Sequence, residues 1–133
     1  MIYALDSNII SYLMRNNETV RARYYSAISD GNRCVIPLMV YYEVRRGLLA
    51  NDAYKRMRSF ENLCTDLGVE TMTVIDMDTA AKIYADRKRR GVLIDDADLL
   101  TAAQSVTRGY VLVTNNTRHF EGIDGLKIDD WAK

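Results

Sequence analysis

Three carboxylates stand at positions where an ionised side chain is costly. Asp6 ends an apolar, strand-like run, Glu43 lies inside the apolar stretch Leu38–Val44, and Asp98 begins an apolar helical pattern. A buried ionised carboxylate is tolerated only when it is paired, hydrogen-bonded or bound to a metal. Acids from separate segments therefore predict a shared partner. The simplest is a hard divalent cation, Mg²⁺ or Mn²⁺, because both prefer oxygen ligands.

These acids suggest distinct chemical roles. We expect Asp6, rigidly placed at a strand end, and Asp98, in the first turn of a helix, to be the metal ligands. Glu43 could reach the same cleft and either bind a second ion or orient the attacking water. A site of this kind lowers the pKa of a bound water and neutralises charge that develops on a phosphodiester. The expected chemistry is therefore phosphodiester hydrolysis.

Each acid also has a simpler structural interpretation. Asp95 and Asp98 are three residues apart, like a capping pair, and the helix dipole favours Asp95 and Asp96 at a helix start in any case. We therefore interpret Asp95 and Asp96 as a helix start beside the cluster. Asp6 could begin an Asx turn, and Glu43 could be neutralised by Arg45, Arg46 or a buried tyrosine hydroxyl. These alternatives explain single residues better than they explain three acids together.

Composition limits the class of protein without deciding it. The chain has 133 residues, which fits one domain spanning residues 1–133. Lys and Arg total 18 and Asp and Glu total 18, so the net charge gives no argument for or against nucleic acid. The densest basic run is Arg87–Arg90. We expect no membrane partner and a cytoplasmic location, because no leader or membrane-length apolar segment is visible.

Cysteine and histidine content excludes several mechanisms. Cys34 and Cys64 have no zinc-ligand spacing and are too few for a disulfide framework, so we expect buried thiols. His119 is the only histidine, which excludes mechanisms that need two imidazoles. We interpret it as an exposed loop residue.

Hydrophobic periodicity predicts alternating strands and helices. Strands are expected at 2–6, 34–36, 69–75, 110–113 and 125–128, and helices at 8–14, 18–29, 38–49, 51–67, 76–90 and 95–108. This order is typical of an α/β fold with a mostly parallel central sheet of four or five strands flanked by helices. Ligands of such sheets bind beyond the carboxyl ends of the strands, where Asp6 and the segment 114–117 are expected.

The order and spacing of several short stretches resemble those of PIN-domain ribonucleases, specifically the VapC toxins of bacterial type II toxin–antitoxin systems. The resemblance spans nearly the whole chain, and its motifs are weak singly but specific together. They are Leu5–Asn8, Tyr42–Gly47, Asp98–Ala103, Val113–Phe120 and Gly125–Trp131.

This resemblance implies a metal-dependent endoribonuclease whose acidic cluster is Asp6, Glu43 and Asp98. It also implies a structured RNA substrate such as transfer RNA, inhibition by a cognate antitoxin protein, and a homodimer. The alternative is a PIN-like module that binds RNA or a partner without catalysis. In that case the acids would cap helices and pair with arginines.

One position departs from the family pattern. Many PIN domains carry an acid two residues after the threonine that corresponds to Thr114, where this chain has Asn116. Asn116 is the fourth candidate catalytic residue, since an amide can ligate a metal or hold a water but cannot act as a base. Asp95, Asp96 or Glu121 could substitute for it.

Neighbouring polar residues are expected to support the acids. Thr114 would hydrogen-bond a carboxylate or water in the site, and Asn8 would orient Asp6. The basic runs Arg45–Arg46 and Arg87–Arg90 would contact RNA phosphates around the acidic pocket.

Overall fold

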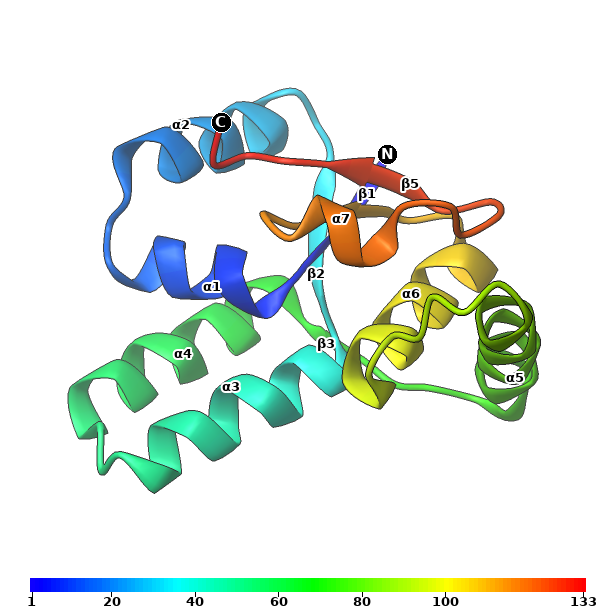
Figure 1. Ribbon diagram of the computed structural model, residues 1–133. Coiled ribbons are helices and arrows are strands. Elements are labelled where there is room, and N and C mark those ends of the chain that lie inside the picture. The colour runs from blue at the N-terminus through cyan, green and yellow to red at the C-terminus, as the bar shows by residue number, and fades with distance from the viewer.

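Five short parallel strands form the central sheet of the computed structural model, which describes residues 1–133 (Figure 1). Their spatial order is β3-β2-β1-β4-β5, and every neighbouring pair is parallel. The strands are β1 (Ile2–Leu5), β2 (Arg33–Pro37), β3 (Val69–Glu70), β4 (Val111–Val113) and β5 (Lys127–Asp129). The predicted α/β fold with a parallel sheet is confirmed.

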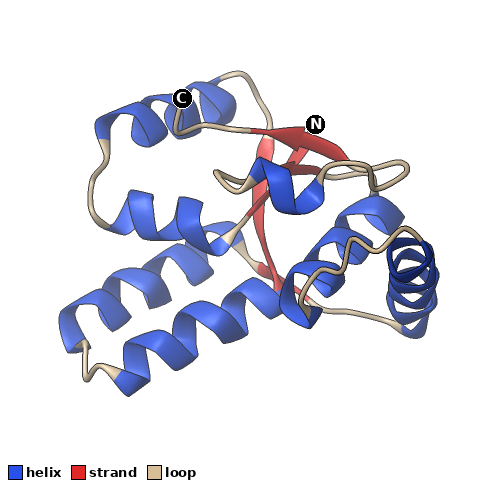
Figure 2. Ribbon diagram, viewed as in Figure 1, coloured by secondary structure: helices blue, strands red, loops and turns tan.

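Helices cover both faces of this sheet (Figure 2). They are α1 (Ser7–Met14), α2 (Glu18–Ser29), α3 (Leu38–Ala50), α4 (Tyr54–Leu67), α5 (Val74–Arg89), α6 (Asp96–Arg108) and α7 (Thr117–Phe120). Helices α1 to α4 gather on one side and α5 and α6 on the other. None of them has the length and hydropathy needed to cross a membrane.

The alternation of side chains along the strands separates two cores. On the side of α1 to α4, Leu5 and Ile36 join the largest cluster, which contains 13 buried residues, including Phe60. On the opposite side, Ala4 and Val35 pack in a second cluster with residues of α6, α7 and β4. Both faces of β1 and β2 are thus buried, which explains why these strands read as continuous apolar runs rather than alternating ones.

The sheet topology brings β1 and β4 together at the centre. From β1 the chain moves to β2 on one side, and later returns to β4 on the other side. This reversal of strand order opens a crevice beyond the carboxyl ends of the two strands, where doubly wound sheets bind ligands. The amide of Asp6 continues the ladder with a 2.9 Å bond to the carbonyl of Val113. The residue after β1 is thereby fixed against the end of β4.

Two predicted elements differ from the structure. The strand expected at 69–75 pairs only over Val69–Glu70, because Thr73 and Asp76 form a capping box that starts α5 at Val74. The helix expected from residue 51 begins at Tyr54, since Asn51 caps the end of α3 and Asp52 adopts a left-handed φ of 48°. Neither change moves a candidate site residue. Both cysteines are free thiols, Cys34 buried and Cys64 half-buried.

Candidate active site

Asp6 is held rigidly at the start of α1. Its side chain is 2% exposed, and its Oδ1 accepts a 2.8 Å hydrogen bond from the amide of Ser7. Its Oδ2 accepts a 2.7 Å bond from the hydroxyl of Thr114 and a 3.4 Å bond from the side-chain amide of Asn8. Burial raises the pKa of Asp6, while these donors act in the opposite direction. The carboxylate is therefore fixed in place but carries no ion pair.

Thr114 links the end of β4 to the start of α1. Its side chain is fully buried, and besides donating to Asp6 its hydroxyl accepts from the backbone amide of Asn116 at 3.0 Å. Asn8 accepts a 3.0 Å bond from the amide of Asn115. The two side chains thus lock the loop after β4 onto Asp6, and the expectations for Thr114 and Asn8 agree with these contacts.

Glu43 enters the crevice from α3. Its Oε1 is buried and has no hydrogen-bond partner. Burial raises the pKa of Glu43 to about 7, helped by the negative charges of Asp6 and Asp98, and Arg46 only partly opposes this. The predicted neutralisation of Glu43 by a neighbouring arginine therefore fails, since no ion pair forms with Arg45 or Arg46.

Asp98 enters from the first turn of α6. Asp95 caps that helix by accepting a 3.0 Å hydrogen bond from the amide of Asp98, which confirms the interpretation of Asp95 as a helix start. Burial and the charges of Asp6 and Asp95 raise the pKa of Asp98, whereas His119 lowers it. The Asp98 side chain is 16% exposed, so it can reach solvent from the crevice.

His119 contacts the acidic cluster, which the sequence interpretation missed. Its Nδ1 lies 3.2 Å from Oδ2 of Asp98, and its side chain is 58% exposed. His119 belongs to the short helix α7 rather than to a loop, so that expectation was wrong in part. The sequence offered one signal for this contact: His119 lies three residues after Asn116, soon after the end of the strand expected at 110–113.

The structure brings together the three acids named from the sequence. One carboxylate oxygen each from Asp6, Glu43 and Asp98 lie within 4.8 Å of one another. Three buried or half-buried carboxylates at this spacing repel one another, and Oε1 of Glu43 has no hydrogen-bond partner. Hard oxygen donors of this kind fit Mg²⁺ or Mn²⁺. The residues present therefore suit a divalent cation.

Asn116 is linked to the acids only through Thr114, whose hydroxyl accepts from the amide of Asn116 and donates to Asp6. Asn116 precedes α7, is exposed, and its side chain makes no capping hydrogen bond. Asp96 and Glu121 are also exposed and outside the cluster. Neither Asp96 nor Glu121 belongs to the group of three acids, and a role for Asn116 stays a prediction.

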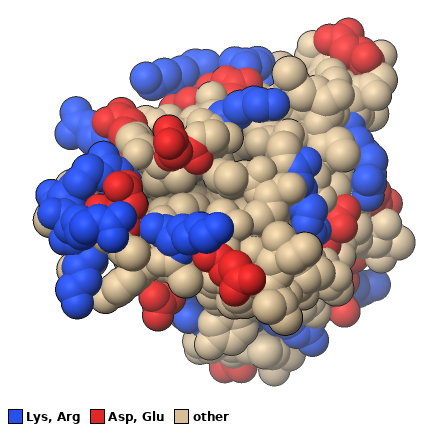
Figure 3. All heavy atoms as spheres, turned by 90° about the vertical axis from the view of Figure 1, so that its right-hand side faces the viewer, with Lys and Arg blue, Asp and Glu red and all other residues tan.

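The basic run Arg87–Arg90 at the end of α5 was expected to contact RNA phosphates, but its residues have different environments. Arg87 is 3% exposed and donates to the backbone carbonyls of Val92, Glu121 and His119. It therefore cannot contact RNA phosphates as expected, because its guanidinium ties the segment 119–121 to α5. Figure 3 shows lysine and arginine gathered at one edge of the face that carries α5, with acidic side chains between them.

Comparison with known proteins gives consistent matches over the whole chain. Residues 3–126 match the family model described as PIN domain. The chain is 30% identical to ribonuclease VapC1 of Haemophilus influenzae strain R2866, over 100% of both proteins. It is 31% identical to the tRNA(fMet)-specific endonuclease VapC of Shigella flexneri, over 98% of both.

A solved structure matches the fold equally well. A chain of VapBC-1 from nontypeable Haemophilus influenzae superposes with a TM-score of 0.88 at 30% identity, over 100% of both chains.

Proposed function

The chain belongs to the PIN-domain family, among its VapC ribonucleases, and we propose that it is a divalent-metal-dependent endoribonuclease that uses Asp6, Glu43 and Asp98. We further propose that residues 1–133 work as one PIN-like nuclease domain. The observation that carries the proposal is the convergence of three carboxylates, from the start of α1, from α3 and from α6, without an ion pair to lysine or arginine. Mg²⁺ or Mn²⁺ would supply the missing charge.

Asp6 and Asp98 are proposed as the metal ligands. Ser7 and Thr114 fix the carboxylate of Asp6 by hydrogen bonds, and one oxygen of Asp98 lies within 4.8 Å of one oxygen of Asp6. A bound ion would lower the pKa of a ligated water and neutralise charge on the phosphodiester. His119 would hold the carboxylate of Asp98 through its Nδ1.

Glu43 is proposed to orient the attacking water. Its Oε1 has no partner within the chain, so it is free to accept a hydrogen bond from a water in the crevice. The oxygen of that water would form a bond to phosphorus while the bond from phosphorus to the leaving ribose oxygen breaks. The proton lost by the water would pass to Glu43, and the leaving oxygen would take up a proton from solvent. Asn116 is exposed, and we propose that its amide contacts water or RNA rather than the metal.

The biological setting follows from the relatives. Relatives of this chain bear the names ribonuclease VapC1 and tRNA(fMet)-specific endonuclease VapC, and the matched solved structure is of VapBC-1. We propose that this chain is likewise the toxin of a toxin–antitoxin pair. It would cleave a structured RNA such as transfer RNA, be inhibited by a cognate antitoxin protein, and act as a homodimer.

The test is cleavage of RNA by the purified protein. We expect cutting of bulk transfer RNA with Mg²⁺ or Mn²⁺ and none after chelation. Asp6→Asn and Asp98→Asn should each lower the rate about 10³-fold, because a metal ligand supplies several kcal/mol of transition-state stabilisation.

Asp96→Asn is the matched control for these variants. Asp96 is exposed in the same helical turn as Asp98 and outside the cluster, so its variant should cut at nearly the wild-type rate. Equal cleavage by wild type, Asp6→Asn and Asp98→Asn would overturn the assignment. RNA retention without cutting under either metal would instead support a binding module.

A further inference from the structure

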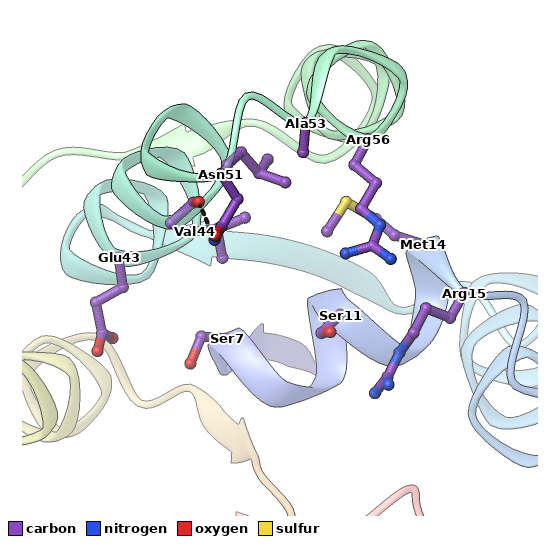
Figure 4. A pocket seen from close by; sticks show the side chains of 11 residues that line it. Ser7, Ser11, Met14, Arg15, Glu43, Val44, Asn51, Ala53 and Arg56 are labelled. Carbon is purple, nitrogen blue, oxygen red and sulfur yellow. Dashed lines mark hydrogen bonds between the residues drawn. The ribbon is translucent and has the colours of Figure 1, made fainter.

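A groove leads away from the acidic cluster between α1, α3 and the start of α4. It has a volume of about 270 Å³. Figure 4 shows Glu43 and Ser7 at one end, Ser11 along its wall, and Arg15 and Arg56 at the other end. The groove is therefore continuous with the proposed site of cleavage and is lined partly by hydroxyl groups.

Both arginines at the far end lack an acidic partner. Neither guanidinium takes part in an ion pair of the chain. Arg15 has only a cation–π contact, with its Cζ 5.2 Å from the centre of the Tyr12 ring. In Figure 4 the side chain of Arg56 extends from α4 toward α1, whereas the guanidinium of Arg15, directly after α1, turns away from Arg56. Both residues line the far end of the groove, and guanidinium groups without a chain partner suit a phosphate in particular.

The floor of the groove contains a glycine that the fold itself does not require. Gly47 lies in the middle of α3, one turn after Glu43 and one turn before Asn51, and all three line the groove. A glycine inside a helix is unfavourable relative to alanine. Its φ is not positive, and a Cβ added there would meet no atom within 4 Å. The space above Gly47 is thus open toward whatever occupies the groove.

The length of the groove suits a nucleotide chain. Ser7, Ser11 and Arg15 follow one another along α1. Eight residues of helix rise about 12 Å, which is long enough for more than one nucleotide of a single strand. A phosphate held at the acidic cluster would therefore place a later phosphate of the same strand near Arg15 and Arg56.

We propose that this groove carries the single-stranded RNA segment next to the scissile phosphate, with Arg15 and Arg56 contacting a phosphate of that segment. This inference rests on the proposed nuclease function and adds the direction in which the substrate leaves the site. Sugar and backbone atoms pass over Gly47, where a side chain would obstruct them. A polyanion fits this surface better than an apolar peptide, because the far end offers two cations with no chain partner.

Binding is tested in an Asp6→Asn background, which prevents turnover, with a short fluorescent oligouridylate as the probe. Arg15→Ala/Arg56→Ala should lower affinity at least tenfold at low salt. It should also flatten the slope of log affinity against log salt by about 0.7, since each neutralised phosphate of a single strand contributes about 0.7. Lys55→Ala/Arg58→Ala is the control, because both side chains are exposed on α4 and do not line the groove.

Cleavage of bulk transfer RNA is tested with Gly47→Leu in the otherwise unchanged chain. The variant should be at least as resistant to heat as the wild type, because leucine favours a helix over glycine, yet should cut at least tenfold more slowly. A merely structural glycine would not separate these two readouts. Gly47→Ala should fall between the two, since its added methyl group is smaller.

The outcomes separate this inference from the proposed function. If the wild type cuts RNA and Asp6→Asn does not, but the arginine pair binds like its control and Gly47→Leu cuts at the wild-type rate, the RNA path is overturned and the nuclease stands. A groove that serves only a peptide would give this result. If the wild type does not cut RNA, the proposed function itself fails.

Discussion

Asp76 and Asp6 are both almost fully buried carboxylates, but the chain gives them different partners. Asp76 is 1% exposed and joins α5 to the end of α6. It accepts hydrogen bonds from the amide of Thr73 at 2.8 Å, from the hydroxyl of Thr107, and from Arg108 at 2.7 Å. Burial raises the pKa of Asp76, but these donors and the charge of Arg108 outweigh it, so its pKa lies below the usual value.

The acidic cluster is built in the opposite way. Asp6, Glu43 and Asp98 face one another without an ion pair to lysine or arginine. Burial raises the pKa of each, and repulsion by neighbouring acids raises the pKa of Glu43 and of Asp98 further. Burial is therefore common to both regions, and the presence of a charge partner distinguishes them. A buried acid that receives hydrogen bonds and a positive charge from its own chain stabilises the fold. A group of buried acids without such a positive charge indicates a binding site for a cation.

The prediction with the largest expected effect compares variants that each lack one acid, either Asp76 or Asp98. Asp76→Ala should lower the free energy of unfolding by about 3 kcal/mol, because it leaves Arg108 and the donors of Thr73 and Thr107 without their acceptor. Asp98→Ala in the metal-free protein should be nearly neutral or stabilising, since it removes repulsion. Urea denaturation with a chelator measures both. Similar losses in the two variants would contradict the distinction.

Several site residues could be predicted because the neighbouring residues in the sequence show that a charged side chain is unfavourable there. Asp6 follows an apolar strand and Asp98 opens an apolar helix, so the mismatch between charge and surroundings can be read without a structure. The parallel order of the strands then indicates which ends meet. The short third strand was also predictable in principle, since Thr73 and Asp76 have the spacing of a capping box, which the apolar pattern around Ile75 concealed.

Other features depend on contacts that no local pattern encodes. Arg87 stands in a basic run that looks solvated, and it is buried only because distant carbonyls of Glu121 and His119 lie where its guanidinium can bind them. His119 meets Asp98 because the loop after β4 folds over α6. Both are consequences of tertiary packing, which spacing along the chain does not determine.

The second test supplies the missing charge. Mg²⁺ or Mn²⁺ should stabilise the wild type by about 2.7 kcal/mol when the free ion is at about 100 times its dissociation constant. The gain should largely disappear in Asp6→Asn and persist in Asp76→Asn, despite the lower starting stability of the latter. Thermal denaturation across a metal titration gives these shifts. Equal stabilisation of both variants would place the ion outside the cluster.

The smallest expected effect is the pH dependence contributed by Glu43. Its pKa is raised from 4.5 to about 7 in the folded chain, so the folded state binds this proton more tightly than the unfolded state. Its contribution is fully present below pH 4.5 and is lost as the pH rises through about 7. For a half-buried group screened by solvent, we expect a loss of about 1–2 kcal/mol.

Glu43→Gln isolates this contribution because glutamine does not titrate. In the metal-free protein, the free energy of unfolding of the wild type should fall relative to Glu43→Gln between pH 5 and pH 8. Urea denaturation at several pH values measures the difference, which cancels titrations that the two proteins share. Saturating Mg²⁺ should reduce it, because a cation beside Glu43 favours the ionised form. Parallel stability profiles without metal would show that Glu43 is already neutralised, and the contrast with Asp76 would then rest on Asp6 and Asp98 alone.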